Sequence, residues 1–344
     1  MTTNTFRMPA EWERQTAVQL TWPHAATDWQ YILSEIDDTY IDMADAISLR
    51  EHLIIVTPEP ERVAALLKQK LSDEQMAKVT LFKCDTDDTW ARDHGFITLV
   101  SSDGINRRLL DFRFNGWGEK FKAENDNAIN RHMFDAGLLG GEYSDELDFV
   151  LEGGAIESDG KGTVFTTSGC LMAPNRNQPL SQADIEKRLK QSLCARRIVW
   201  IDHGNLVGDD TDGHIDTLVR VAPNDTLLYV ACSDRNDEQY DGLHLMEEQL
   251  KCLLTDDGKP YRLIPLPSPR AIYDGGERLP ATYANFLVIN GAVLYPTYAQ
   301  PDLDEEARQA LAMAFPGLEL VGIDCRSIIK QHGSLHCCTM QLYR

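Results

Sequence analysis

The chain has 344 residues and is strongly acidic, because 54 Asp and Glu stand against 33 Lys and Arg and give a formal net charge of −21. That balance argues against a nucleic-acid partner, whose phosphates need a basic surface, but it would draw a small cation toward a cleft. No apolar run has the length of a membrane span, and the polar N-terminal stretch lacks the apolar core of a signal peptide. We therefore expect a soluble cytoplasmic protein with no membrane partner.

In the first half of the chain, short apolar strands alternate with amphipathic helices. The clearest signal is the apolar face formed by Ile32, Ile36, Met43 and Ile47, which predicts a helix over 28–50. The remaining predictions for this half are strands at 18–22, 53–56, 79–82, 96–100 and 109–112, and helices at about 63–71 and 125–138.

The second half continues the alternation. A helix begins at Ser181, with Asp184 and Glu186 in the first turn where negative charge suits the helix dipole. The other predicted elements are helices at 238–254 and 303–314, and strands at 163–166, 198–201, 215–221, 227–232, 262–266, 286–289, 292–295 and 318–323, followed by a terminal strand that carries two cysteines.

The predicted helices near 126, 181, 238 and 303 recur at intervals of roughly 55 to 65 residues, as a repeated supersecondary unit would. No linker rich in Ser, Gly or Pro divides the chain, so we expect one α/β domain over residues 1–344. The alternation by itself would also suit an open, doubly wound sheet.

Four polar stretches lie at the edges of predicted strands, where loops gather functional groups. They are Asp87-to-Gly95, with its carboxylates around an Arg and a Trp, Asn115-Gly116-Trp117-Gly118, Glu152-Gly153-Gly154, and Asp209-to-Thr217. In the last of these, a strand beginning at Ile215 would place His214 and Asp216 on one face, because side chains alternate along a strand.

A His-x-Asp pair can also bind a metal ion, but the other histidines lack the spacing of a ligand set. The eight cysteines are scattered and form no C-x-x-C pair, which disfavours a zinc cluster and a disulfide framework. No glycine-rich phosphate-binding motif follows a strand. We therefore expect neither a metal ion nor a cofactor.

The most suggestive stretch is His332-to-Thr339, in which a Gly-Ser turn leads to His336, Cys337 and Cys338. Each of these residues also has an ordinary structural explanation. A free Cys is usually a small buried apolar residue, and a Trp is often part of the hydrophobic core. Asp93, next to Arg92, could belong to a structural ion pair. A thiol, carboxylates and aromatic side chains together suit a planar guanidinium ion, which carboxylates grip, aromatic rings stack on, and a thiolate can attack at carbon.

Eight motifs, in order over nearly the whole chain, resemble those of the agmatine deiminases, which belong to the family of Porphyromonas-type peptidylarginine deiminases. The motifs are Met8-to-Glu13, Thr21-Trp22-Pro23, Asp88-to-Asp93, Asn115-to-Gly118, Glu152-Gly153-Gly154, Gly213-to-Asp216, Arg278-to-Phe286 and Gly333-to-Cys337. The resemblance implies a pentein fold, in which five ββαβ-like units surround a central active site about a pseudo-fivefold axis.

The resemblance also implies roles for seven side chains. These are Cys337 as the nucleophile, His214 as the general acid and base, Asp93 and Asp216 as the carboxylates that hold the guanidinium nitrogens, Glu152 as a further carboxylate of the site, and Trp90 and Trp117 as pocket walls. Cys338 stands where the family usually has an apolar residue. On a strand, Cys338 and His336 would both face away from Cys337, so neither is expected to take part.

The implied reaction converts agmatine and water into N-carbamoylputrescine and ammonia through a covalent amidino-thioether, as a step of putrescine (polyamine) biosynthesis. One alternative is a deiminase of free or peptidyl arginine, and another is a pentein that binds partners without catalysis. The acidic Asp209, Asp210 and Asp212 favour a substrate with a distal amine over arginine. The expected partner is a small guanidine cation, and a homodimer is an alternative that the sequence leaves open.

Overall fold

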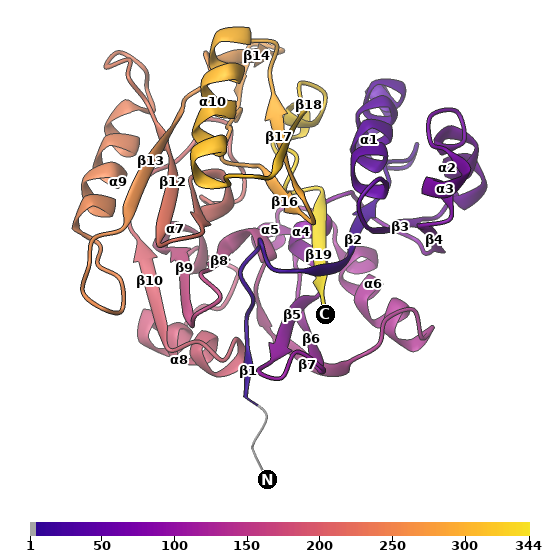
Figure 1. Cartoon of the computed structure of the whole chain (residues 1–344), viewed down its shortest axis with the longest axis horizontal. Coiled ribbons are helices and arrows are strands. Elements are labelled where there is room, and N and C mark those ends of the chain that lie inside the picture. The colour runs from indigo at the N-terminus through magenta and orange to yellow at the C-terminus, as the bar shows by residue number, and fades with distance from the viewer. Residues whose placement is uncertain (1–4) are drawn as a thin grey trace.

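The computed structural model describes residues 5–344, so the first four residues of the predicted polar lead-in lie outside the described residues (Figure 1). Within that range, five sheets of three or four strands share one connection pattern. An antiparallel strand pair is followed by a helical segment and then by a strand parallel to the second member of the pair. The predicted recurrence of a supersecondary unit matches this repetition.

The first sheet joins the two ends of the chain. Its strand β2 (Gln15–Thr21) pairs antiparallel with the C-terminal strand β19 (Thr339–Tyr343) and parallel with β3 (His52–Thr57), which pairs with β4 (Val79–Lys83). The helical segments of this unit are a 3-10 turn (Asp28–Ile32), α1 (Leu33–Ser48), α2 (Pro60–Leu67) and α3 (Asp73–Met76). The helix predicted over 28–50 is therefore confirmed, and Ile36, Met43 and Ile47 of its apolar face are fully buried.

The second and third sheets follow along the chain. The second contains β1 (Phe6–Arg7), β5 (Ile97–Ser101), β6 (Arg107–Arg113) and β7 (Glu142–Val150), with α4 (Ala91–His94), α5 (Gly116–Glu119) and α6 (Glu124–Asp135). The third contains β8 (Ile156–Ser158), β9 (Thr163–Thr167) and β10 (Arg197–Ile201), with α7 (Ser168–Leu171) and α8 (Gln182–Ser192). Ser181 caps α8 as predicted, in a reciprocal capping box with Asp184.

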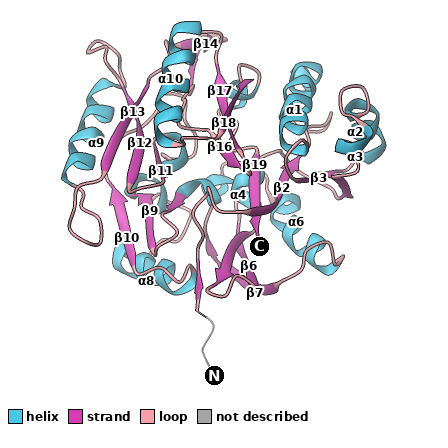
Figure 2. Cartoon of the chain, in the orientation of Figure 1, coloured by secondary structure: helices cyan, strands magenta, loops and turns pink. Residues whose placement is uncertain are grey.

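The fourth and fifth sheets repeat the three-stranded form. They contain β11 (Val219–Ala222), β12 (Thr226–Ala231), α9 (Tyr240–Cys252) and β13 (Arg262–Pro267), and then β16 (Leu287–Ile289), β17 (Ala292–Thr297), α10 (Pro301–Ala314) and β18 (Glu319–Asp324). The hairpin of β14 (Ile272–Asp274) and β15 (Glu277–Leu279) connects the two. In Figure 2 the longer helices lie around the periphery, whereas the short α4 lies near the centre.

Two strand predictions are wrong, and both concern the polar centre. The chain forms a 3-10 turn at Ile215–Thr217, closed by the Thr217 side chain on the His214 carbonyl, and β11 begins only at Val219. The terminal strand begins at Thr339, because Thr339 donates to the His336 carbonyl and closes a turn over the two cysteines. In both places a hydroxyl side chain binds the backbone locally and competes with the strand ladder.

The described residues contain no helix that is both long and apolar enough to cross a membrane.

Candidate active site

Three short connections between the sheets bring functional residues to one point. Asp93 comes from α4, Gly154 from the 3-10 turn Gly153–Ala155, and His214 and Asp216 from the turn before β11. A Cβ atom on Gly154 would lie 2.6 Å from His214 Nδ1, 2.9 Å from Asp93 Oδ1 and 3.2 Å from Asp216 Oδ2. Only a glycine lets the backbone come this close, so the second glycine of the Glu-Gly-Gly motif is a packing requirement of the site.

A cavity of about 350 Å³ opens beside this point. Cys337, Asp93, Trp90 and Trp117 line its inner part, and Asp28, Asp88, Phe121, Asp210, Thr211, Gln331, His332 and Gly333 complete the wall. Among these described lining residues none is Lys or Arg, and four are Asp. The cavity therefore favours a cationic ligand whose inner end lies against a thiol.

Cys337 lies on the turn before β19 and is almost fully buried, with its Sγ 3.9 Å from Asp216 Oδ2. The backbone N–H groups of His336 and Cys337 donate to Asn285 Oδ1 at 2.8 and 3.2 Å, which fixes the turn. Burial, with the negative charges of Asp216 and Asp93, raises the pKa of the Cys337 thiol well above its ordinary value. The free protein therefore holds a thiol, and a bound cation would favour the thiolate.

Asp93 is held by two donors. Trp117 Nε1 donates to its Oδ2 at 3.0 Å and the Gly154 N–H donates to its Oδ1 at 3.1 Å. Trp117 has left-handed backbone angles (φ 55°, ψ 46°), a strained conformation that aims its indole at this carboxylate. Burial raises the pKa of Asp93 to about 6, with the charges of Asp216 and Glu152 adding to the shift and His214 opposing it.

The pKa of Asp93 leads to a prediction for the pH dependence of turnover. A carboxyl group grips a cation only when it is ionised, and Asp93 gains its proton as the pH falls through about 6. We expect the slope of log kcat/KM against pH for a guanidine substrate to increase by one proton below that pH, in addition to the slope that loss of the Cys337 proton gives above it. A kcat/KM profile measured at constant ionic strength tests this, and an acid limb that begins only near pH 4 (about the ordinary Asp value) would contradict it.

His214 is completely buried, and neither ring nitrogen has a hydrogen-bond partner among the described residues. Its Nδ1 lies 3.6 Å from Asp93 Oδ1. Burial opposes protonation of the ring, but Asp93, the neighbouring Cys170 and Glu152 outweigh it and raise the pKa of His214 well above its ordinary value. A protonated His214 can give its proton to an atom of a bound substrate.

Glu152, Cys170 and His214 offer ligand-type atoms within 4.8 Å of one another, which raises the question of a metal ion. Both Glu152 oxygens are taken by Arg176 Nε, at 2.9 and 3.2 Å. Arg176 is itself buried and also binds Asp212 at 2.6 Å. A metal ion at this place would have to displace a guanidinium group, so the cluster is a buried ion pair behind His214, and Glu152 does not line the cavity.

The sequence-based expectation for His336 is wrong. Its Nδ1 lies 2.7 Å from Asp216 Oδ2, so the ring faces the site rather than away from it. The alternation rule fails here because the residue lies in a turn and not on a strand. Cys338, in contrast, is fully buried and is not among the cavity-lining residues, and burial raises the pKa of its thiol to about 12.

Comparison with known proteins places these residues in a family. A family model described as Porphyromonas-type peptidyl-arginine deiminase matches residues 7–342. A curated relative from Marinomonas sp., named "Putative agmatine deiminase", is 32% identical over 359 residues, covering 98% of this chain and 94% of the relative.

Two solved structures extend the likeness to the fold. The "Putative Arginine Deiminase" from Porphyromonas gingivalis is 50% identical, with a TM-score of 0.93 over 99% of each chain. A Cys-to-Ser variant of the C. jejuni agmatine deiminase with substrate bound is 35% identical, with a TM-score of 0.90 over 100% of this chain and 98% of the other.

Proposed function

The chain belongs to the Porphyromonas-type peptidyl-arginine deiminase family, and from that premise we propose that it is an agmatine deiminase. The reaction would convert agmatine and water into N-carbamoylputrescine and ammonia. The chemistry would come from Asp93, Asp216 and His214, which meet at Gly154, and from Cys337, which lines the cavity with Asp93 and contacts Asp216.

The observation that carries the substrate assignment is the charge of the cavity wall. Agmatine has a guanidinium ion at one end and an ammonium ion at the other, whereas arginine adds a carboxylate beside the amine. Asp28, Asp88 and Asp210 are the more exposed aspartates of the wall, whereas Asp93 and Cys337 are buried, and no described lining residue is Lys or Arg. These carboxylates suit a distal ammonium ion and repel a carboxylate. The likeness to the P. gingivalis arginine deiminase keeps arginine as the second candidate substrate.

In the proposed mechanism the guanidinium ion lies between Asp93 and the free Oδ1 of Asp216, against Trp90 and Trp117. The cation lowers the cost of ionising Cys337, whose proton leaves to solvent, and the thiolate attacks the guanidinium carbon.

Two proton transfers by His214 would then complete the turnover. The protonated ring gives its proton to the departing nitrogen, so ammonia leaves and an amidino-thioether cation remains on Cys337. The neutral ring takes a proton from water, which attacks the same carbon. The tetrahedral adduct then expels the Cys337 thiolate, and its hydroxyl proton passes to that sulfur as the carbamoyl product forms, which restores the thiol.

We further propose that the five sheets form a single pentein domain, arranged about a pseudo-fivefold axis with this site at its centre. The shared connection pattern and the pairing of β19 with β2, which joins the chain ends, support that arrangement. The eight free cysteines suit a reducing compartment such as the cytoplasm, where a deiminase of this type would serve putrescine biosynthesis.

Product identification tests the proposal. Purified protein incubated with agmatine should release ammonia and N-carbamoylputrescine in equal amounts, and a metal chelator should leave the rate unchanged because the chemistry needs no metal ion. Release of citrulline from arginine without any product from agmatine would overturn the substrate assignment. Loss of turnover in the chelator would overturn the proposed thiol mechanism.

A further inference from the structure

His336 lies between two carboxylates, one on each side of its ring. Nδ1 is 2.7 Å from Asp216 Oδ2, and Nε2 is 3.0 Å from Glu11 Oε2. Nδ1 donates to Asp216 when it carries the hydrogen, and Nε2 lies between the Glu11 carboxylate and the Arg220 guanidinium group. His336 therefore ties Asp216, which faces the cavity's thiol, to a residue on the N-terminal segment.

A buried arginine fixes Glu11, the residue on the side of His336 away from Asp216. Arg220 binds Glu11, donates to Glu157 at 2.5 Å and to the Ala284 carbonyl at 2.8 Å, and lies 3.1 Å from His336 Nε2. Arg220 is 1% exposed. Glu11 thus has a fixed place, and it can hold the histidine ring without turning toward solvent.

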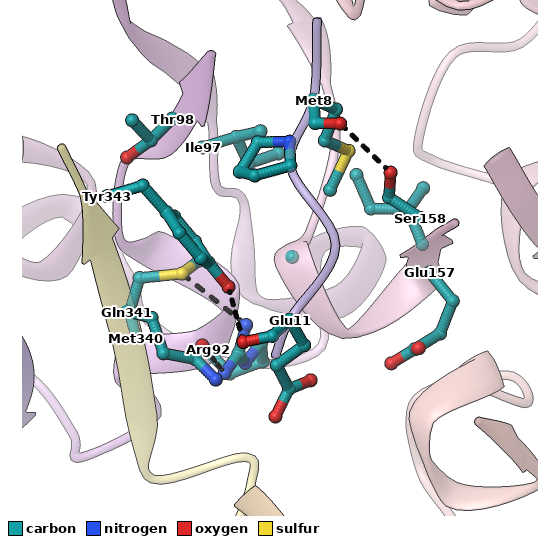
Figure 3. Close-up of a pocket in the computed structure, with 13 residues that line it drawn as sticks. Met8, Glu11, Arg92, Ile97, Thr98, Glu157, Ser158, Met340, Gln341 and Tyr343 are labelled. Carbon is teal, nitrogen blue, oxygen red and sulfur yellow. Dashed lines mark hydrogen bonds between the residues drawn. The ribbon is translucent and has the colours of Figure 1, made fainter. Parts of the chain in front are cut away.

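Glu11 and Glu157 also line a small pocket, about 40 Å³ in volume, that Cys337 does not line. Figure 3 shows Glu11 on the N-terminal segment, with Arg92 and Tyr343 beside it and Glu157 across the pocket. This volume holds a water molecule or two and no larger ligand. The cluster is therefore support for the site and not a second binding site.

The two oxygens of Asp216 differ in their surroundings. Oδ2 is bound by His336, whereas Oδ1 has no hydrogen-bond partner among the described residues although it is fully buried. A buried carboxylate oxygen without a donor costs free energy, which a bound guanidinium ion would recover. Burial alone would raise the pKa of Asp216, but the hydrogen bond and charge of His336 outweigh it and hold that pKa below its ordinary value.

We propose that His336 is a positioning residue that keeps Asp216 ionised and turned so that its free Oδ1 faces the guanidinium ion. The inference rests on the proposed function, because it assigns Asp216 to that cation. The charged groups around Asp216 are His336, His214, Asp93, Cys337 and, farther off, Arg220. His336 donates the short hydrogen bond to Asp216 Oδ2, at 2.7 Å, whereas the Cys337 thiol donates to the same oxygen only at 3.9 Å.

Two amide variants separate the two sides of the ring. In His336→Asn the side-chain amide can take the place of Nδ1 and donate to Asp216, whereas in His336→Gln it takes the place of Nε2 and leaves Asp216 Oδ2 with only the long contact from the Cys337 thiol. We expect His336→Gln to raise KM by about tenfold to a hundredfold, the loss of a hydrogen bond to a charged group. We expect His336→Asn to stay close to wild type.

The pH profile gives a readout that a merely structural role would not move. Without the His336 donor, Asp216 would share the high proton affinity of Asp93, so the acid limb of kcat/KM in His336→Gln should begin at higher pH and steepen by one further proton. His52→Asn, which changes a half-buried histidine on β3 bound to Thr80, is the control and should leave the limb in place. Equal KM values and an unmoved limb in both His336 variants would overturn the proposal.

One measurement needs neither a folded variant at His336 nor a substrate. Infrared difference spectra of wild type against Asp216→Asn report the Asp216 carboxylate directly as the pH is lowered. We expect it to take up its proton only below about pH 4, the ordinary range of an aspartic acid. Protonation above that pH would overturn the role given to His336. Failure of the protein to act on agmatine would instead overturn the proposed function and leave this result standing.

Discussion

Replacing Cys337 by Ala is expected to lower kcat for agmatine by about 10⁴-fold or more, because the sulfur atom forms and breaks the only covalent bond between protein and substrate. Among the described residues that line the cavity, Cys337 is the only thiol. The substitution removes a single atom from a buried position, so the folded state should persist and the thermal midpoint should change by only a few degrees.

Cys338→Ala is the matched control, since the two cysteines are neighbours and both are buried. Its thiol does not line the cavity, and burial raises its pKa to about 12. We expect this variant to lose about 1 kcal/mol of stability, from the small void, and to keep its kcat. Initial rates of ammonia release from both variants, with thermal melts, decide the matter. If turnover survives in Cys337→Ala and disappears in Cys338→Ala, the nucleophile is Cys338 and the assignment of Cys337 is wrong.

Much of the fold follows from apolar patterning. The face of α1, the cap of α8 and the alternation of strands and helices are local features, so a short window of sequence contains them. The nine-residue strand β7 (Glu142–Val150) escapes this reasoning, because it pairs only with β6 and buries only Phe149 and Val150 fully. An edge strand with charged side chains has no apolar run to reveal it.

In the candidate site, sequence motifs indicated the reactive residues, whereas their supporting partners appear only in the structure. The polar motifs indicated Asp93, His214, Asp216 and Cys337, and the structure brings all four together. The residues that support them were given no role from the sequence, since Arg176 reaches Glu152 across 24 positions and Asn285, although it lies in the Arg278-to-Phe286 motif, binds the Cys337 N–H across 52. Such partners depend on the tertiary fold. The prediction for His336 was wrong for another reason. It assumed the alternating side-chain directions of a strand at a place where the chain forms a turn.

The second large effect concerns the end of the substrate that does not react. A bound arginine would place its carboxylate among Asp28, Asp88 and Asp210, where the described cavity wall offers only His332 as a basic side chain. An unpaired carboxylate in an acidic cavity is disfavoured by several kcal/mol. We expect kcat/KM for agmatine to exceed that for arginine by about a thousandfold, which corresponds to about 4 kcal/mol.

Competition between the two substrates tests the preference for agmatine most directly. Agmatine and arginine are mixed at equal concentrations with the protein, and both products are quantified by mass spectrometry. The ratio of initial product formation equals the ratio of the two kcat/KM values. We expect N-carbamoylputrescine in excess over citrulline by about a thousandfold. Citrulline as the major product would contradict the reading of the cavity wall and make the protein an arginine deiminase.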